Sequence, residues 1–507
     1  MRSKYLSLVP ALVAFACSSG QAPAQPDSGT APGGEGGAPG AFSYTPAGCM
    51  YTVTPPASRA YVNEALDDTT AVDPTMGAPN RVRLGLGGTT TAGQPGYPDI
   101  TTTATFTWET AEVDHAAKVK LGPSATSLSD VHTGYVWTSP SPVNAIGSGE
   151  PAVNMHEVHV CGLMPAKTYY YQVGGGPTGQ EVWSATQSFT TLPATGAITV
   201  GMLGDARDES TTWQLVNQRM QSLNVAAILF SGDLVLWGTQ ESLYTTWLDA
   251  IWKDPSGGPG FLTLGQIMLL PIAGNHENEA VQFYSAFSIP GDGTYAKAYN
   301  SFNIGSAHIV MIDDQPIAQL PGGTEATAQL AWLDQDLAAA NADRANHPFI
   351  VAMAHRGVFS TSQHSADVDV LQARTSLVPL YDKYHVDMVF AGHDHEYERS
   401  YPVTAGSPIS GPPVVVKSGP GTTYIISAGA GADPYAVGAG MFPYRAQFAQ
   451  FCPGNAQATC SAPAMDKAYI GVYGTLTING TSLTFKAYGL KGAGGADDML
   501  DTVTLTH

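Results

Sequence analysis

The sequence predicts an α/β domain preceded by an all-β sandwich, and three observations support this prediction. From residue 196 onward, short β-branched apolar runs alternate with helical patterns, which favours a layered α/β core. Between about residues 99 and 192, short alternating strands follow one another without a helical pattern. After about residue 410 the helical period disappears again. We therefore expect an all-β module over residues 43–194 and a larger α/β domain, with a C-terminal β region, over residues 195–507.

The N-terminus has the features of an export signal. Arg2 and Lys4 precede the apolar run 6–16, which is shorter than the roughly 20 residues that span a bilayer. Small residues before Cys17 resemble a bacterial lipobox, in which the cysteine is lipidated, although Ala14 replaces the usual leucine. We expect residues 1–17 to be a signal peptide with a lipobox; ordinary signal-peptidase cleavage nearby is the alternative.

This signal sets the expected location. A lipoprotein of this type would lie outside the cytoplasm, at the bacterial outer membrane, in the periplasm or on the cell surface. Cleavage without lipidation would instead give a secreted protein. Residues 18–42 are rich in Ser, Gly, Ala and Pro, have no aromatic residue before Phe42 and are expected to form a disordered linker. We expect membrane contact only through the lipid anchor.

Four cysteines remain if Cys17 is lipidated, and an even number in an exported protein suggests disulfides. Cys452 and Cys460 would close a short loop, whereas Cys49 and Cys161 would tie the start of the β module to its body. Four cysteines permit three pairings, and the sequence does not choose among them.

The predicted β module contains alternating strands such as 104–108, 118–121 and 158–160. The stretch 163–171 resembles the tyrosine corner of a fibronectin type III sandwich. His156 and His159 in this region are expected to be strand residues and not metal ligands.

The net charge of −20 argues against a basic surface that binds a nucleic-acid backbone. It does not exclude a phosphorylated small substrate, because bound metal ions would dominate the local field.

In the α/β region, five apolar runs each end in a polar cluster. The runs are 197–203, 225–231, 267–273, 349–353 and 386–391, and the helical patterns are 213–223, 241–252, 326–340 and 368–384. The clusters are Gly204-Asp205, Gly232-Asp233, Gly274-Asn275-His276-Glu277, Ala354-His355-Arg356 and Gly392-His393-Asp394-His395. Any one cluster alone is explained by a turn. Together, at the carboxyl ends of strands, they supply the carboxylate, amide and imidazole ligands that two divalent metals need.

This order of motifs, GD, GD, GNH(D/E), H and GHxH, resembles the calcineurin-like metallophosphoesterases, and among them the purple acid phosphatases. Further stretches match the family at 329–333, 397–399 and 423–431, so the resemblance covers roughly residues 95–507. It implies a two-sheet β-sandwich core flanked by helices, preceded by a fibronectin III-like domain. The alternating runs on either side of the turn Asn479-Gly480 fit the second sheet of this core.

The resemblance also implies a set of ligands for two divalent or trivalent ions of iron, manganese or zinc. Asp233 would bridge the two ions; the remaining ligands would be Asp205 and His395 for the first ion, and Asn275, His355 and His393 for the second. His276 would face the substrate and stabilise the transferring group or protonate the leaving oxygen. His364 falls where these phosphatases place a second substrate-facing histidine.

Two positions depart from the family pattern. Leu236, with Trp237 beside it, stands where the family has a tyrosine ligand, and Arg207 stands where other metallophosphoesterases have a histidine. Asp208 or water can supply the missing ligand. Arg207 can orient a substrate phosphate or form a salt bridge at the turn. Without the tyrosine we expect a colourless protein that does not favour ferric iron at its first site, unless Tyr244 or Tyr397 reaches the metal.

The leading functional hypothesis is metal-dependent hydrolysis of phosphate esters by an acid phosphatase-like phosphomonoesterase outside the cytoplasm. A phosphodiesterase or nucleotidase with the same metals is an alternative. Another is a surface binding lipoprotein with a decayed catalytic site, which the complete motif set argues against. In each enzymatic case the partner is a phosphorylated small molecule.

Overall fold

The computed structural model describes residues 44–507 with gaps. The gaps are 54–59, 62–71, 75–76, 91–93, 112–115, 139–152, 208–209, 253–262, 292–298, 407–408, 410, 436–441, 450, 452–468 and 493–494. The expectations for the signal peptide, the linker, Asp208 and the Cys452–Cys460 pair concern residues outside the described part. Within that part, no helix has the length and apolar character that a bilayer crossing requires.

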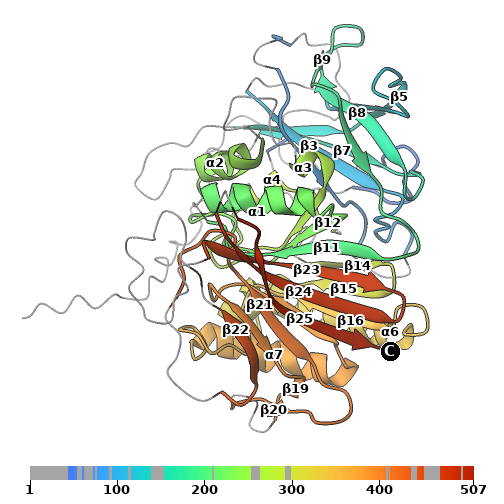
Figure 1. Cartoon of the computed structure of the whole chain (residues 1–507). Helices are drawn as coiled ribbons and strands as arrows, with labels where there is room; N and C mark the ends of the chain where they lie inside the picture. The colour runs from blue at the N-terminus through green and yellow to red at the C-terminus, as the bar shows by residue number, and fades with distance from the viewer. Residues whose placement is uncertain are drawn as a thin grey trace, which may run out of the picture. The chain divides into compact units, whose positions relative to one another are not determined.

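The N-terminal module consists of two antiparallel sheets (Figure 1). One has the order β1 (Ala60–Tyr61), β6 (Tyr135–Thr138), β7 (Asn154–Val160), β3 (Ala104–Thr110) and β2 (Asn80–Gly85). The other has the order β10 (Gln187–Thr190), β8 (Thr168–Gly175), β4 (Lys118–Gly122) and β5 (Asp130–Thr133), with β9 (Val182–Trp183) paired to β8. The predicted all-β sandwich is therefore confirmed.

Alternating apolar side chains hold the two sheets together. Phe106 on β3 and Phe189 on β10 are buried with ring centroids 5.5 Å apart, as period-2 strands predict. The backbone N–H of Met164 donates to the Tyr169 hydroxyl at 2.9 Å, which is a tyrosine-corner contact. A disulfide joins Cys49 to Cys161 and ties the first described residues to the end of β7.

His156 and His159 both lie buried in β7, as expected for strand residues. His156 bonds to Thr110 at 2.9 Å, and His159 contacts Glu157 at 2.8 Å. Each histidine therefore has a hydrogen-bond partner within the sandwich.

The α/β domain has two larger sheets. The six-stranded sheet has the order β13 (Met268–Pro271), β12 (Ala227–Phe230), β11 (Ile198–Leu203), β23 (Gly471–Asn479), β24 (Ser482–Leu490) and β25 (Asp498–Thr506). The seven-stranded sheet has the order β14 (Asn300–Ile304), β15 (Ala307–Met311), β16 (Phe349–Met353), β17 (Met388–Ala391), β21 (Thr423–Ser427), β18 (Tyr397–Ser400) and β22 (Arg445–Ala449). A separate pair is formed by β19 (Val403–Thr404) and β20 (Val414–Val415).

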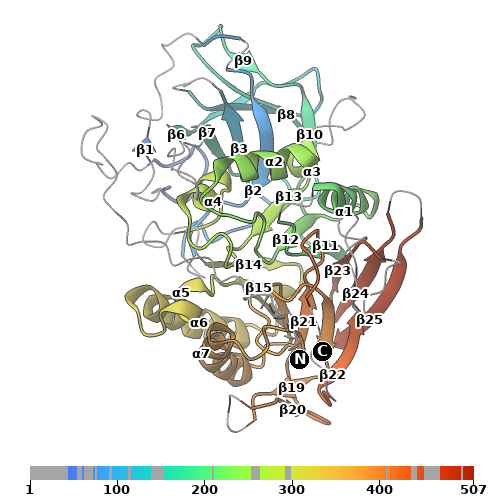
Figure 2. The ribbon, with the colours of Figure 1, turned by 90° about the vertical axis from the view of Figure 1, so that its left-hand side faces the viewer.

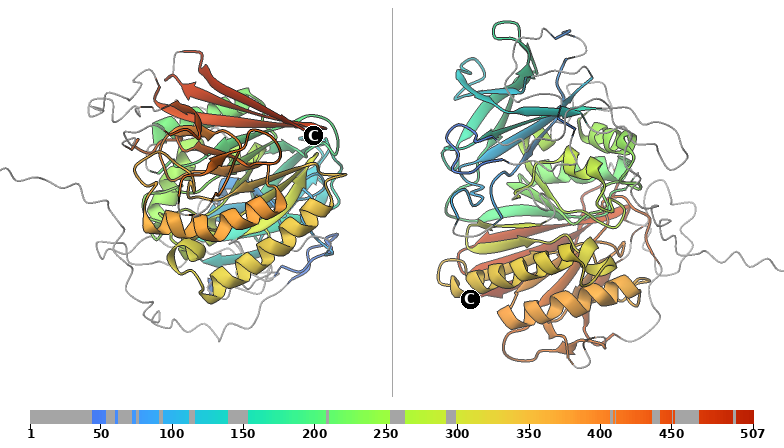
Figure 3. Two further views of the ribbon diagram at one scale, coloured as in Figure 1. Left: turned by 90° about the horizontal axis from the view of Figure 1, so that it is seen from below. Right: turned by 180° about the vertical axis from the view of Figure 1, so that it is seen from behind.

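The helices cover the outer faces of these two sheets (Figures 2 and 3). They are α1 (Ser210–Ser222), α2 (Glu241–Trp252), α3 (Thr263–Gln266), α4 (Val281–Ala286), α5 (Gln315–Gln319), α6 (Thr324–Ala342) and α7 (Val368–Tyr384). Strand residues alternate between the layers: Ile228 packs with α1 and α2, whereas Leu229 packs between the sheets. Helices α6 and α7 cover the other sheet, with Leu333 and Leu377 packed on Ile350. This is the two-sheet core flanked by helices that the resemblance implies.

The C-terminal hairpin belongs to the six-stranded sheet. Strand β23 pairs antiparallel with β11, with Leu476 opposite Val200, and β24 folds back on β23 after the predicted turn, where Gly480 has φ 56°. The hairpin therefore extends the sheet that carries three of the polar clusters.

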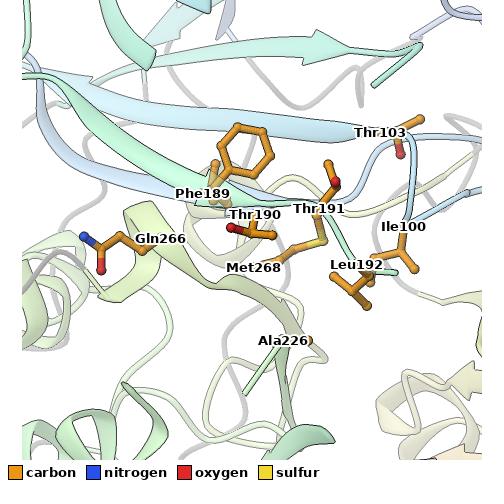
Figure 4. Close-up of a pocket in the computed structure, with 10 residues that line it drawn as sticks. Ile100, Thr103, Phe189, Thr190, Thr191, Leu192, Ala226, Gln266 and Met268 are labelled. Atoms are coloured by element: carbon orange, nitrogen blue, oxygen red, sulfur yellow. The ribbon is translucent and has the colours of Figure 1, made fainter. Parts of the chain in front are cut away.

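Hydrogen bonds from two arginines join the sandwich to the α/β domain. Arg83 donates through Nε to the Ala286 carbonyl and through Nη1 to Glu109, both at 2.7 Å, while Arg81 bonds Asp249 on α2. A small, mainly apolar cavity lies at this junction, and Figure 4 shows Phe189 of the sandwich and Met268 of β13 among its lining residues. The cavity includes none of the predicted site residues.

Candidate metal centre

The five polar clusters lie where the sequence predicts, directly after strands. Asp205 follows β11, Asp233 follows β12, Asn275 follows β13, His355 follows β16 and His393 follows β17. The pairs β11–β12, β12–β13 and β16–β17 are parallel, so these carboxyl ends meet at common edges.

Three of the predicted ligands adopt the left-handed backbone conformation. The φ angles are 60° at Asp205, 56° at Asp233 and 70° at His393. Side chains other than glycine adopt this region at a cost, and such residues cluster at functional sites. The strained positions in these turns are therefore those of predicted metal ligands.

Two glycines let the loops approach one another closely. A Cβ atom on Gly274 would lie 2.3 Å from Oδ1 of Asp233, and one on Gly392 would lie 2.3 Å from Oδ2 of Asp205. Any larger residue at either position would displace a carboxylate. The glycines in the GNH and GHxH clusters are therefore required by packing around the two aspartates.

Asn275 lies between two imidazoles, one of which also contacts a carboxylate. Its Oδ1 atom lies 2.8 Å from Nε2 of His355 and 2.9 Å from Nδ1 of His393. Nε2 of His355 is also 3.2 Å from Oδ1 of Asp233, while Nδ1 of His355 donates to the Ser231 carbonyl at 2.7 Å. The structure thus brings together all four residues expected at the second metal position.

Asp205 and His395 form the other half of the centre. Nε2 of His395 lies 3.4 Å from Oδ1 of Asp205, and Nδ1 donates to the Asp433 carbonyl, which turns Nε2 inward. The same Asp205 oxygen accepts the backbone N–H of His393 at 3.0 Å. Both side chains are fully buried.

The oxygen and nitrogen atoms at this centre are suited to act as metal ligands. Oδ2 of Asp205 and the Nε2 atoms of His393 and His395 are buried without a hydrogen-bond partner among the described residues. One ligand atom each from Asp205, Asp233 and His355 lies within 4.8 Å of the others. Buried acceptors without donors are costly unless a cation meets them.

Burial and neighbouring charges shift the acid–base behaviour of these groups. Burial, reinforced by the charge of Asp233, raises the pKa of the Asp205 carboxyl to about 8. Burial would also raise the pKa of Asp233, but the facing histidines and Arg207 hold it well below its usual range. Burial and the nearby His355 lower the pKa of His393, which keeps its ring neutral and able to coordinate a metal.

Comparison with known proteins agrees with this geometry. Residues 199–397 match the family described as calcineurin-like phosphoesterase, and residues 79–191 match the N-terminal domain of purple acid phosphatase. The chain carries a calcineurin-like phosphoesterase domain behind a purple acid phosphatase N-terminal domain. The solved structure of a purple acid phosphatase from yellow lupin seeds has the same fold, with a TM-score of 0.65 at 17% identity over 85% of this chain and 74% of that chain.

Curated relatives match parts of the chain. It is 27% identical to probable purple acid phosphatase 20 of Arabidopsis thaliana over 48% of this chain and 55% of the relative, so it spans about half of that protein. It is 25% identical to human acid phosphatase type 7 over 62% of this chain and 75% of the relative.

Two histidines of the phosphoesterase domain lie beside the ligand set. Nδ1 of His276 donates to the Leu236 carbonyl at 2.6 Å, and its Nε2 is 3.8 Å from Oδ2 of Asp233. Nδ1 of His364 is 2.7 Å from Asp367, while its Nε2 is buried and has no partner in the described structure. The His364 ring lies 4.6 Å from that of His393, so both predicted substrate-facing histidines are at the centre.

The two departures from the family pattern have different structural outcomes. Leu236 takes part through its backbone carbonyl, and its side chain offers no ligand atom. Arg207 donates through Nη2 to Oδ2 of Asp233 and to the Tyr435 hydroxyl, both at 3.1 Å. The salt bridge considered for Arg207 is therefore present, and its partner is the predicted bridging aspartate.

The two tyrosines that the sequence offered as replacement ligands lie in different surroundings. The Tyr397 hydroxyl donates to Asp501 on β25 at 2.6 Å and is committed there. Tyr244 lies on α2 in an apolar cluster, and its buried hydroxyl has no hydrogen-bond partner among the described residues. A third tyrosine, Tyr435, reaches the centre, and its ring stacks on His395 with the centroids 4.1 Å apart. No local pattern in the sequence distinguishes Tyr435, because it lies in a loop.

Sequence reasoning also missed the residues that hold the ligand loops in place. The Glu277 carboxylate accepts the backbone N–H groups of Asp233, Leu234, Val235 and Gly274 at 2.8–3.2 Å. Asp314 accepts both the backbone N–H and Nη1 of Arg356, next to His355, at 2.6 Å. Glu277 and Arg356 were visible as motif members, and only their contacts identify their roles.

Proposed function

We propose that this protein is a binuclear metal-dependent phosphoric ester hydrolase that acts, as a phosphomonoesterase, on a phosphorylated small molecule. The observation that carries the proposal is the convergence of buried, partnerless donor atoms at one edge of the two sheets. Asp233 would be shared by both ions. Asp205 and His395 would hold the first, and Asn275, His355 and His393 the second. The relatives named above support the same reaction.

Two ions held there would supply Lewis-acid chemistry, which polarises phosphoryl oxygens and makes water nucleophilic near neutral pH. The protein's own contribution comes from the side chains around them. Because Nδ1 of His276 is committed to the Leu236 carbonyl, its Nε2 is the nitrogen that gains or loses a proton. As an imidazolium, His276 would donate from Nε2 to the leaving oxygen.

His364 and Arg207 would position the phosphoryl group. The partnerless Nε2 of His364 and the buried Nε of Arg207 are available to phosphoryl oxygens. A guanidinium and an imidazole on different loops fix the orientation of an anion by charge-assisted hydrogen bonds.

We propose that the reaction takes place outside the cytoplasm and that Cys17 carries a lipid anchor. The support is the charged start, the short apolar run and the residues before Cys17, together with the Cys49–Cys161 disulfide, which suits an oxidising compartment. Replacing Cys17 with Ser should release the protein from membranes of the producing cell. Unchanged membrane association, or a mature N-terminus well beyond residue 17, would contradict the anchor.

The activity is tested with purified protein on a chromogenic phosphate monoester and the matching diester. We expect faster hydrolysis of the monoester, loss of activity after chelation, and recovery when Mn²⁺, Zn²⁺ or Fe²⁺ is added back. Hydrolysis that survives both chelation and Asp233→Ala would refute the metal-dependent mechanism. A clear preference for the diester would refute the monoesterase assignment and leave the metal chemistry in place.

A further inference from the structure

The two proposed metal positions have unequal sets of donors. The second position has two imidazoles, one amide oxygen and a carboxylate, tied together by the contacts of Asn275 at 2.8 and 2.9 Å. The first has only Asp205, His395 and a share of Asp233. Among the described residues, Asp205, Asp233 and His355 form a group whose ligand atoms all lie within 4.8 Å of one another, and the third member of this group belongs to the second position.

The positively charged guanidinium of Arg207 lies at the first metal position. Nη2 of Arg207 is 3.1 Å from Oδ2 of Asp233, whereas His355 approaches the other oxygen, Oδ1, at 3.2 Å. The same Nη2 atom also donates to the hydroxyl of Tyr435, whose ring stacks on His395, so the guanidinium lies on the His395 side of the centre. A dication bound between Asp205, Asp233 and His395 would therefore be next to a fixed positive charge.

Tyr435 keeps that charge in place. Its hydroxyl accepts a hydrogen bond from Nη2 of Arg207 at 3.1 Å, and its ring stacks on His395 with an interplanar angle of 23°. The loop that carries it is attached to the centre, because the Ala432 N–H donates to the Asp205 carbonyl at 2.9 Å. Arg207 is thus held between an aspartate and a tyrosine and is not free to move into solvent.

We propose that Arg207, positioned by Tyr435, makes the first metal position much the weaker one, so that the centre takes up its metals in sequence, the second position first. The inference rests on the ligand set in the proposed function. Its physical basis is the repulsion between a guanidinium and a divalent ion in a buried, low-dielectric site, added to the missing fourth protein ligand.

The test measures metal binding, not activity. Protein stripped of metal is titrated with Mn²⁺ by calorimetry, and bound metal per chain is counted after equilibrium dialysis. We expect one tight equivalent and a second that binds at least about tenfold more weakly, as a nearby like charge requires. Arg207→Ala removes the charge, and Arg207→His also adds a neutral donor. Both substitutions should lower the dissociation constant of the second Mn²⁺ equivalent about tenfold or more. Arg207→His should lower it more than Arg207→Ala.

Matched variants separate charge from other causes. Arg207→Lys retains the positive charge and should retain the separation between the two affinities. Arg219→Ala removes a guanidinium that pairs with Asp497 far from the centre, and should change neither affinity. The inference would be overturned if the unmodified protein bound its two Mn²⁺ equivalents with equal affinity. It would also be overturned if the difference between the two affinities were unchanged in both Arg207→Ala and Arg207→His. Either result would leave the hydrolase proposal intact. A protein that binds no metal would overturn both.

Discussion

Nε2 of His355 lies 2.8 Å from Oδ1 of Asn275 and 3.2 Å from Oδ1 of Asp233. Nδ1 of His355 is 2.7 Å from the Ser231 carbonyl, which fixes the orientation of the ring. The same Asn275 oxygen lies 2.9 Å from Nδ1 of His393, so one amide oxygen lies against two imidazoles. Amide, carboxylate and imidazole atoms that converge in this way are the ligands that a divalent metal takes.

Asn275→Ala should lower metal content and activity together. The substitution removes the amide oxygen that both His355 and His393 approach. We expect less bound metal per chain after dialysis, and hydrolysis of a phosphate monoester close to background. Asn341→Ala, on the outer helix α6, is the matched control and should behave like the unmodified protein. A fully active Asn275→Ala protein would remove Asn275 from the ligand set.

His276→Ala should separate metal binding from turnover. His276 contacts Leu236 and faces Asp233, and it belongs to neither proposed metal position. We expect unchanged metal content and a fall in kcat of roughly 10²–10⁴-fold, as for loss of a general acid. Steady-state kinetics and metal analysis on the same preparation measure kcat and bound metal separately. Loss of metal in this variant would show instead that His276 is a ligand.

His364→Ala should have a milder effect, mainly on substrate affinity. Its Nε2 lies beside the His393 ring with no partner in the described structure, as expected for a group that meets the phosphoryl group. Loss of one such hydrogen bond should reduce kcat/KM by about tenfold, or about 1.4 kcal/mol. The same kinetic series measures it, and an effect as large as that of His276→Ala would require a chemical role for His364.

Glu277→Ala should destabilise the fold more than an ordinary surface substitution. It leaves four buried backbone N–H groups without their acceptor, at about 1–3 kcal/mol for each that finds no other partner. We expect the free energy of unfolding in urea to fall by about 3 kcal/mol or more. Glu325→Ala, on α6, is the control. A loss below about 1 kcal/mol would mean that water replaces the carboxylate.

The metal-loaded protein should be colourless. A tyrosine-to-ferric charge-transfer band needs a phenolate on the metal, and the hydroxyl of Tyr435 is instead bonded to Arg207. With iron, manganese or zinc added, we expect no visible absorption band. If a band forms and Tyr435→Phe abolishes it, then Tyr435 is a ligand and the first position is stronger than we propose.

The sequence by itself determined the strands, the order of the motifs and most of the residues that meet at the proposed metal centre. Helices expected at 241–252 and 368–384 have those bounds in the structure, and those expected at 213–223 and 326–340 begin two or three residues earlier as α1 and α6. Apolar periodicity and turn residues are local signals, so they define an element and the turn at its end. Because parallel strands end at one edge, Asp205 and Asp233 could be placed together in advance.

Only the tertiary structure decided how the surrounding loops complete the centre. Arg207 and Tyr435 are 228 residues apart, and their contact depends on how the loop after β21 packs over the edge of the six-stranded sheet. The choice of Cys161 as partner of Cys49 depends likewise on the fold of the sandwich. Periodicity carries no information about contacts between distant loops, because these depend on side-chain packing and charge in three dimensions.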